Sequence, residues 1–240
     1  MSEGDPGPGD AGGGGGSFWT SLPTILSAAA LLIGAVTTAI VQLRGNGGDD
    51  RQASGATGTT QTTSTPGLSQ FVAMTRPGGR NYFEGDTMYV KASVPARPVL
   101  VLAEGDQPLQ DVRMRAHTEW VSGAKDYGIG FVCRYANANS YYLLSVLSGG
   151  RYHIVRYRQG KPVSLTGGIQ TNGLIEDGAN DIDVKCIGSN PTLLTLLVDG
   201  KEIETVRDED GIAEGSVGVR VGTSESVVTC SFRDFTLSSL

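Results

Sequence analysis

Residues 126–161, DYGIGFVCRYANANSYYLLSVLSGGRYHIVRYRQGK, are the stretch that decides the fold of this chain. Its first part carries apolar side chains at every second position, with Ile129, Phe131 and Cys133 in one phase. A period of two is typical of a β-strand with one face on a core, and it places Arg134 on the opposite, outward face. The stretch therefore begins with a strand that is buried on one side.

Two further strands complete this stretch. Residues 141–147, YYLLSVL, are apolar in both phases, which predicts an interior strand covered on both faces. A Ser-Gly-Gly turn follows, in which glycine supplies the positive φ values of a hairpin, and residues 151–158 return as the third strand. The asparagines in 136–140 favour a tight connection between the first two strands. We expect a three-stranded meander.

The rest of the chain after residue 68 also reads as short strands separated by turn residues. Asp199 and Gly200 join LLTLLV to KEIETV, which predicts a two-residue hairpin. Many strands at roughly ten-residue spacing, with no helical period between them, indicate an all-β fold, a two-sheet antiparallel β-sandwich or jelly roll. The other expected strands are residues 70–74, 87–93, 99–103, 111–118, 181–187, 192–198, 202–206, 216–221 and 226–237.

Glycine is unevenly distributed and divides the chain into parts. There are 35 glycines in 240 residues, and many of them lie in residues 1–17 and 45–67. Such segments bury too little apolar surface to offset chain entropy. We expect a disordered tail at 1–17, a flexible Gly/Ser/Thr linker at 45–67 and one globular domain at 68–240.

Residues 18–44 lie between these two polar segments and are apolar. No charged residue occurs from 22 to 43, and a helix of that length crosses a hydrocarbon core of about 30 Å. We predict a single transmembrane α-helix that acts as an uncleaved signal anchor, because a basic stretch before it is missing. The alternatives are a buried helix of a soluble protein and a cleaved signal peptide. Ala30, Gly34 and Thr38 form a stripe of small residues that suits a helix-mediated homodimer.

Charge excludes one class of partner and leaves the membrane orientation open. The formal net charge of -6 and a pI near 4.9 argue against nucleic-acid binding, which needs clustered Lys and Arg. Arg44 and Arg51 follow the predicted helix, so the positive-inside rule alone would place the C-terminal domain in the cytoplasm. Two charges are a small basis for orientation, and the cysteines discussed below favour the opposite side.

The order of these strand signals resembles the concanavalin A-like lectin/glucanase superfamily, and within it the laminin-G-like jelly-roll domains of bacterial membrane-anchored surface proteins. The resemblance rests on GIGFVCRYANANSYYLLSV, SGGRYHIVRY, GANDIDVKCIG, LLTLLVDGKEIETVRDEDGIAEGSVGVRVG and VVTCSFRDFTL, and it covers nearly all of residues 89–237. It implies a curved sandwich with any ligand on the concave sheet or at the rim. The superfamily contains sugar-binding modules, glycosidases and protein-binding domains, so the resemblance predicts the fold better than the function.

The sequence contains no recognisable catalytic constellation. Glucanases of this superfamily carry a Glu-x-Asp-x-x-Glu strand that presents paired carboxylates, and no such run occurs here. Asp181 and Asp183 share a strand face but fit solvent-facing acids better. The two histidines are not spaced as zinc ligands, and we expect no cofactor. Asp208 and Asp210 lie in an acidic loop that offers oxygen ligands for calcium, although a solvated turn explains the loop as well.

The three cysteines share phase with apolar neighbours, so all of them should point into the core. Laminin-G-like surface domains that resemble this one often carry cysteines at the positions of Cys133 and Cys186, and the resemblance implies a disulfide between these two with Cys230 as a buried thiol. The alternative is three buried thiols in a reducing compartment. A disulfide requires an oxidising location, and we therefore expect a single-pass plasma-membrane protein with an extracytoplasmic domain.

One sheet face carries the candidate ligand-binding residues. Arg113, Arg115 and His117 alternate with apolar residues, and we expect Arg134 and Arg156 to lie outward near them. Arginine forks bind carboxylates and sugar hydroxyls, so the face suits an acidic glycan or an acidic peptide of a surface protein. The alternative is a solvated sheet surface with cross-strand ion pairs.

We expect a membrane-anchored, non-catalytic module for glycan or protein recognition at the cell surface. A glycoside-acting hydrolase of the glucanase type and a structural spacer remain as alternatives.

Overall fold

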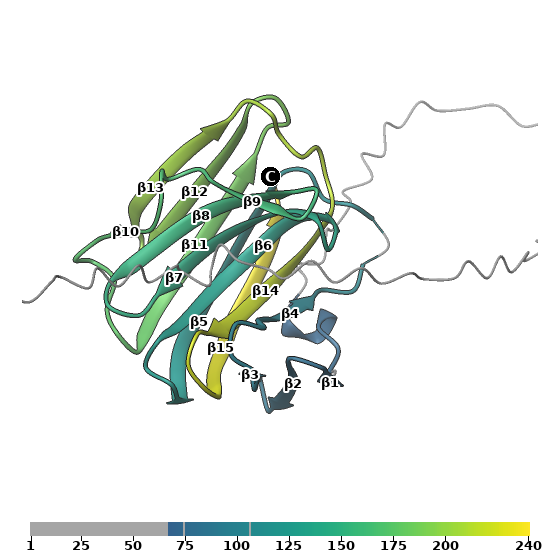
Figure 1. Cartoon of the computed structure of the whole chain (residues 1–240). Coiled ribbons are helices and arrows are strands. Elements are labelled where there is room, and N and C mark those ends of the chain that lie inside the picture. The colour runs from purple at the N-terminus through teal and green to yellow at the C-terminus, as the bar shows by residue number, and fades with distance from the viewer. Residues whose placement is uncertain (1–66, 74, 106) are drawn as a thin grey trace, which may run out of the picture. The chain divides into compact units, whose positions relative to one another are not determined.

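The computed structural model describes residues 67–73, 75–105 and 107–240 and has the predicted all-β architecture, a two-sheet antiparallel sandwich (Figure 1). Within those residues the only helix is a single 3₁₀ turn, η1 (Leu68–Gln70). The two sheets lie face to face, and the strands of the decisive stretch, β6, β7 and β8, lie together in one of them.

The first sheet has eight strands in the order β1-β2-β3-β15-β5-β11-β12-β13. Their bounds are β1 (Thr75–Arg76), β2 (Gly79–Glu84), β3 (Thr87–Ala92), β15 (Val228–Ser239), β5 (Val112–Gly123), β11 (Ala179–Ile187), β12 (Thr192–Val198) and β13 (Lys201–Asp208). The second sheet has seven strands in the order β10-β8-β7-β6-β14-β4, with β9 paired to β8. Their bounds are β10 (Gln170–Thr171), β8 (Arg151–Arg158), β7 (Ser140–Leu147), β6 (Tyr127–Asn137), β14 (Ser216–Thr223), β4 (Val99–Leu102) and β9 (Lys161–Ser164).

The two short hairpin turns predicted from the sequence are confirmed. Asp199 and Gly200 both have positive φ, 51° and 76°, as a primed two-residue hairpin requires, and they connect β12 to β13. Gly149 and Gly150 likewise have φ of 73° and 68° in the turn between β7 and β8. The three-stranded meander is therefore confirmed, and β7 is an interior strand of its sheet.

The prediction was wrong at the beginning of the domain. The strand expected at 70–74 is absent from the described part of that range, where η1 ends and Phe71 forms only an isolated bridge to Ala103. The strand β2 was missed because its first residue, Gly79, belongs to a Pro-Gly-Gly sequence that reads as a turn. A side chain at Gly79 would overlap the Lys91 carbonyl oxygen, so this glycine allows β2 to pair closely with β3.

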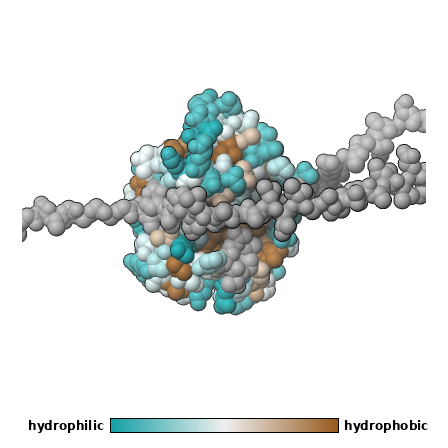
Figure 2. All heavy atoms as spheres, turned by 45° about the vertical axis from the view of Figure 1, so that its right-hand side comes forward, coloured by the Kyte–Doolittle hydropathy of each residue, from teal (hydrophilic) through white to brown (hydrophobic). Residues whose placement is uncertain are grey.

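The core lies between the sheets and consists mostly of apolar side chains, together with a few buried charged groups such as Arg134 and Arg156. Alternate residues of each central strand enter it, such as Val112, Met114 and Ala116 of β5, which are fully buried. On the face of the molecule shown in Figure 2, hydrophilic side chains predominate and hydrophobic ones lie in small separate groups. Apolar burial between the sheets is therefore the main source of stability, at about 25 cal/mol per Å².

A disulfide joins the two layers of the sandwich. Cys133 of β6 and Cys186 of β11 are bonded across the core, as the resemblance implied, and Cys230 is a buried free thiol. All three side chains have no solvent exposure, which confirms that they point inward. Burial raises the pKa of the Cys230 thiol far above its usual value, so this cysteine is an unreactive core residue.

The predicted tail, transmembrane helix and linker at 1–17, 18–44 and 45–67 lie outside the described residues, except for Gly67. The same applies to the small-residue stripe and the homodimer expected from it. In the part of the chain that the structure covers, no helix is long and apolar enough to span a membrane.

Candidate functional site

The outer face of the eight-stranded sheet carries three of the predicted site residues. Arg113, Arg115 and His117 project outward from β5 because the intervening residues are in the core. Their side chains are 45%, 54% and 23% exposed. The alternation along β5 was therefore interpreted correctly, and the three residues are accessible from solvent.

Two aspartates of the neighbouring strand β11 pair with these three side chains. The Arg113 Nε is 3.0 Å from both carboxylate oxygens of Asp183, and its Nη2 is 2.5 Å from one of them. The Asp181 carboxylate accepts from Arg115 at 2.9 Å and contacts the His117 Nδ1 at 2.7 Å. These cross-strand pairs are the ones named as an alternative to a ligand site, and they balance most of the positive charge of the face.

The pairing fixes the charge state of Asp181, which lies between Arg115 and His117. Hydrogen bonds to His117 and then to Arg115 hold the pKa of Asp181 below its ordinary value, and the pKa of Arg113 is raised by its hydrogen bonds to Asp183. Asp181 therefore remains an ionised hydrogen-bond acceptor with a fixed orientation.

A surface pocket of about 360 Å³ lies beside this ion-pair cluster and is lined by Arg115, His117, Asp181, Asp234 and Thr236. Its shape depends on an irregularity in β15, whose register against β5 shifts between Arg233 and Thr236. Asp234 has φ of 54° at this bulge, a conformation that aspartate tolerates better than most residues. The sequence reading missed Asp234 and Thr236, because a one-residue bulge leaves no clear trace in composition or periodicity.

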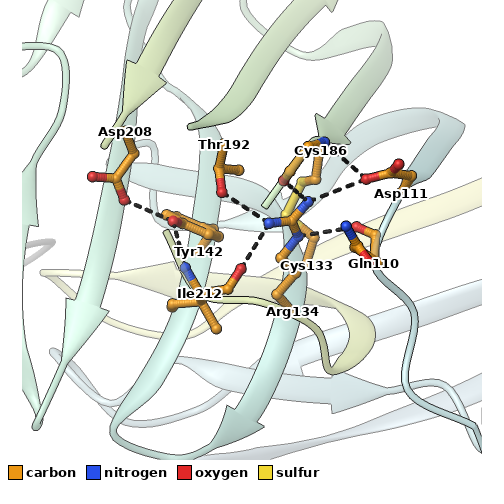
Figure 3. The surroundings of a disulfide bond; sticks show 10 residues. Gln110, Asp111, Cys133, Arg134, Tyr142, Cys186, Thr192, Asp208 and Ile212 are labelled. Atoms are coloured by element: carbon orange, nitrogen blue, oxygen red, sulfur yellow. Dashed lines mark hydrogen bonds and ion pairs between the residues drawn. A yellow bond between two sulfur atoms is a disulfide. The ribbon is translucent and has the colours of Figure 1, made fainter. Parts of the chain in front are cut away.

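Arg134 does not lie on this face, and the expected outward orientation was wrong. Its side chain has no solvent exposure, its φ is 52°, and the register of β6 against β7 shifts just after Cys133. The bulge turns the guanidinium inward, where it donates to the carbonyl oxygens of Gln110, Gly188 and Ile212 and to the Thr192 hydroxyl (Figure 3). Arg134 is a structural cation beside the disulfide.

Arg156 is also buried and belongs to the core phase of β8. Its Nη1 is 2.5 Å from the Asp208 carboxylate of β13, which also accepts from the Tyr142 hydroxyl at 2.6 Å. The expected position near Arg113 was therefore wrong. Tyr152 and Ile154, four and two residues before it on β8, lie in the core, so Arg156 shares the inward phase of the strand.

The contacts of Asp208 and Asp210 replace those that a calcium ion in this acidic loop would need. Both oxygens of the Asp208 carboxylate accept hydrogen bonds from protein groups, and Asp210 is exposed and 3.7 Å from Arg156. Arginine thus supplies the positive charge that calcium would have supplied. Over the described ranges, no group of three or more His, Cys, Asp or Glu side chains is arranged to hold a metal ion.

Comparisons with known proteins agree with this architecture. No protein-family model and no curated protein matches the chain. A solved structure similar to it is a prokaryotic β-1,3-1,4-glucanase (lichenase) derived from a mouse hindgut metagenome, with TM-score 0.52, 8% identity and coverage of 74% of this chain and 99% of that one. A native glycosidic hydrolase matches with TM-score 0.50 and 9% identity over 70% and 89% of the two chains.

The Bacillus subtilis carbohydrate-binding module CBM66 also matches, with TM-score 0.49, 12% identity and coverage of 73% and 94%. At identities this low, the likeness to the two hydrolases shows the fold alone. That fold is the two-sheet antiparallel β-sandwich described above.

Proposed function

We propose that this protein is a membrane-anchored, non-catalytic module of the laminin-G-like branch that binds glycans at the cell surface. The observation that carries the proposal is the pocket of about 360 Å³ on the outer face of the eight-stranded sheet. It presents two carboxylates, a guanidinium, an imidazole and a hydroxyl within one exposed depression. A sugar offers hydroxyl groups that both donate and accept hydrogen bonds, and such a mixed lining can satisfy them in pairs.

The ion pairs favour binding because they hold the polar groups in place before a ligand arrives. Asp181 is oriented by Arg115 at 2.9 Å and by His117 at 2.7 Å, so neither its position nor its charge has to change when a hydroxyl donates to it. Groups that are already ordered lose less conformational entropy on binding. Arg113 is held by Asp183 through its Nε and Nη2 atoms, so it contributes to the order of the face.

The lowered pKa of Asp181 supports a non-catalytic role. A glycosidase needs one carboxylic acid that keeps a proton for the leaving group, and the hydrogen bonds from His117 and Arg115 oppose protonation of Asp181. The alternative hydrolase is favoured by one observation, since Asp181 and Asp234 line the same pocket. Release of reducing ends from a polysaccharide by the wild-type chain, and its loss in Asp234→Asn, would decide for the hydrolase.

Membrane anchoring and location are part of the same proposal. The uncharged run from 22 to 43 supports an uncleaved anchor in the plasma membrane, with 45–67 as a flexible stalk. The Cys133–Cys186 disulfide supports an extracytoplasmic domain. Arg44 and Arg51 favour a cytoplasmic domain, but two charges are a weaker basis for orientation. We expect no nucleic acid and no cofactor among the partners.

The test uses the full chain in detergent micelles on a glycan array. Wild type is compared with Arg115→Ala/His117→Ala and with the matched control Arg207→Ala, whose arginine is exposed on β13 and pairs with nearby Glu209. We expect the double variant to lose at least about tenfold in affinity and the control to bind as wild type. Equal binding by all three would exclude this pocket. Failure to bind any glycan would favour a protein partner or a spacer role.

A further inference from the structure

A second, larger cavity of about 570 Å³ adjoins the proposed glycan-binding pocket beside Arg115, His117 and Asp181. The two cavities share one wall residue, Asp234 at the β15 bulge. The second cavity lies where η1, the β2–β3 hairpin and β15 meet, and its lining residues are Leu68, Ser69, Phe71, Phe83, Gly85, Asp86, Asp234 and Phe235. The shared residue makes the two cavities neighbours on the surface.

The lining of this second cavity combines an aromatic floor with an acidic rim. Phe71 and Phe235 are almost fully buried, with ring centroids 5.0 Å apart, and Phe83 is partly exposed above the core. Asp86 is exposed in the hairpin turn, where Gly85 has φ of 57°. A sugar ring can place its apolar face on such a floor while its polar groups reach the rim.

The charges of the combined groove argue against an acidic ligand. Asp181 is balanced by Arg115 and His117, whereas neither Asp86 nor Asp234 forms an ion pair within the described residues. Two carboxylates therefore remain unbalanced at the larger cavity, and they would repel a uronic acid or a sulfate and attract an amine. This reverses the acidic glycan that the arginines of β5 alone suggested.

We propose that the two cavities are adjacent subsites for an oligosaccharide of amino sugars. One unit hydrogen-bonds to Asp181, Arg115 and Thr236, while the next lies against Phe83 with its ammonium group beside Asp86 and Asp234. The inference rests on the proposed glycan-binding function. It adds that the ligand has at least two sugar units and that it carries positively charged amino groups.

The test measures calorimetric affinities of the full chain in detergent micelles for glucosamine, its β-1,4-linked dimer and the N-acetylated forms of both, in mildly acidic buffer that protonates the amine. We expect the wild-type affinity to rise at least about tenfold from the amino monomer to the amino dimer. Asp86→Asn should weaken binding of the amino dimer and remove most of its preference over the acetylated dimer, because the variant lacks one of the two carboxylates beside the ammonium group. Glu225→Gln, which alters an exposed acid in the β14–β15 loop, should leave the gain intact.

A second variant separates the aromatic contribution from the charge. Phe83→Leu keeps an apolar side chain and should weaken both the amino and the acetylated dimer, with the folded state checked by thermal unfolding. Equal affinity for monomer and dimer, an unaffected dimer in Asp86→Asn, or preference for the acetylated dimer would each overturn the two-subsite inference while leaving glycan binding in place. If no glycan binds to wild type, both proposals fail.

Discussion

Arg134 shows at the scale of a single residue how one backbone angle changes the role of a side chain. With a positive φ, the guanidinium enters the sandwich and bonds to segments that precede β5, follow β11 and precede β14. Burial lowers the pKa of Arg134, and the nearby Tyr142 and Asp111 act in the opposite direction. An arginine has enough margin to stay charged, so it serves as a permanent donor to buried carbonyl groups.

Replacing this arginine should destabilise the fold strongly. Arg134→Met keeps most of the volume but leaves carbonyl oxygens without donors, and we expect the free energy of unfolding to fall by about 3–5 kcal/mol. Urea denaturation of the full chain measures the change. The matched variant Arg207→Met breaks a pair with Glu209 that is exposed on both sides and should cost at most about 1 kcal/mol. Equal losses in the two variants would contradict the structural role of Arg134.

His153 is the residue from which a pH dependence of stability is expected. It is 1% exposed, its Nε2 lies 2.8 Å from the Ser164 hydroxyl, and its Nδ1 has no hydrogen-bond partner among the described residues. Burial lowers the pKa of His153 from 6.5, so the unfolded chain binds a proton more readily than the folded one. Its contribution to stability is complete above pH 6.5 and decreases as the pH falls toward the folded-state pKa.

The prediction is a loss of unfolding free energy on acidification that His153→Gln largely removes. Urea denaturation at neutral pH and near pH 5 measures the slope in both proteins. Asp181, whose pKa is also lowered, contributes its own loss only at more acidic pH, because its ordinary value is 3.8. Parallel slopes in wild type and variant would show that His153 does not titrate in this window.

At the scale of strands, regular segments could be predicted from the sequence and irregular ones could not. The period of two placed the cysteines of β6, β11 and β15 correctly in the core. It failed where a bulge inserts one residue, after Cys133 in β6 and near Asp234 in β15. Since a shift of one residue exchanges the two faces of a strand, the bulge in β6 reversed the predicted side of Arg134. Arg156 was also placed on the wrong side, although β8 pairs with β7 in regular register.

The disulfide between β6 and β11 gives a prediction at this scale. It closes a loop with a sequence separation of 53, for which the chain-entropy model gives about 4 kcal/mol of stabilisation. Cys133→Ala/Cys186→Ala should therefore unfold at clearly lower temperature, and Cys230→Ala should lose only the cost of a small core cavity. Thiol titration of the denatured, unreduced chain should find one thiol, and three after reduction. Three thiols before reduction would exclude the disulfide.

For the whole molecule, long-range strand pairing explains what sequence could not supply. Arg113 and Asp183 are 70 residues apart and meet because β11 lies beside β5. Each strand could be recognised alone, but its neighbour depends on how all strands pack into two sheets. The arginines of β5 therefore suggested a basic face, whereas the folded face is a set of ion pairs next to a cavity with excess carboxylate.

The location of the domain is the prediction that concerns the complete chain. If residues 18–44 anchor it and 68–240 lie outside the cell, a protease added to intact cells should remove an epitope at residues 225–240. The Cys133–Cys186 bond should already be present in chains alkylated before lysis, because the outside of the membrane is oxidising. The opposite orientation, favoured by Arg44 and Arg51, predicts a protected epitope and three alkylated cysteines.

The two readouts depend on different physical properties, accessibility and redox state, so their agreement would establish the orientation. A protected epitope with an intact disulfide would contradict the link between redox state and location on which the extracytoplasmic placement rests.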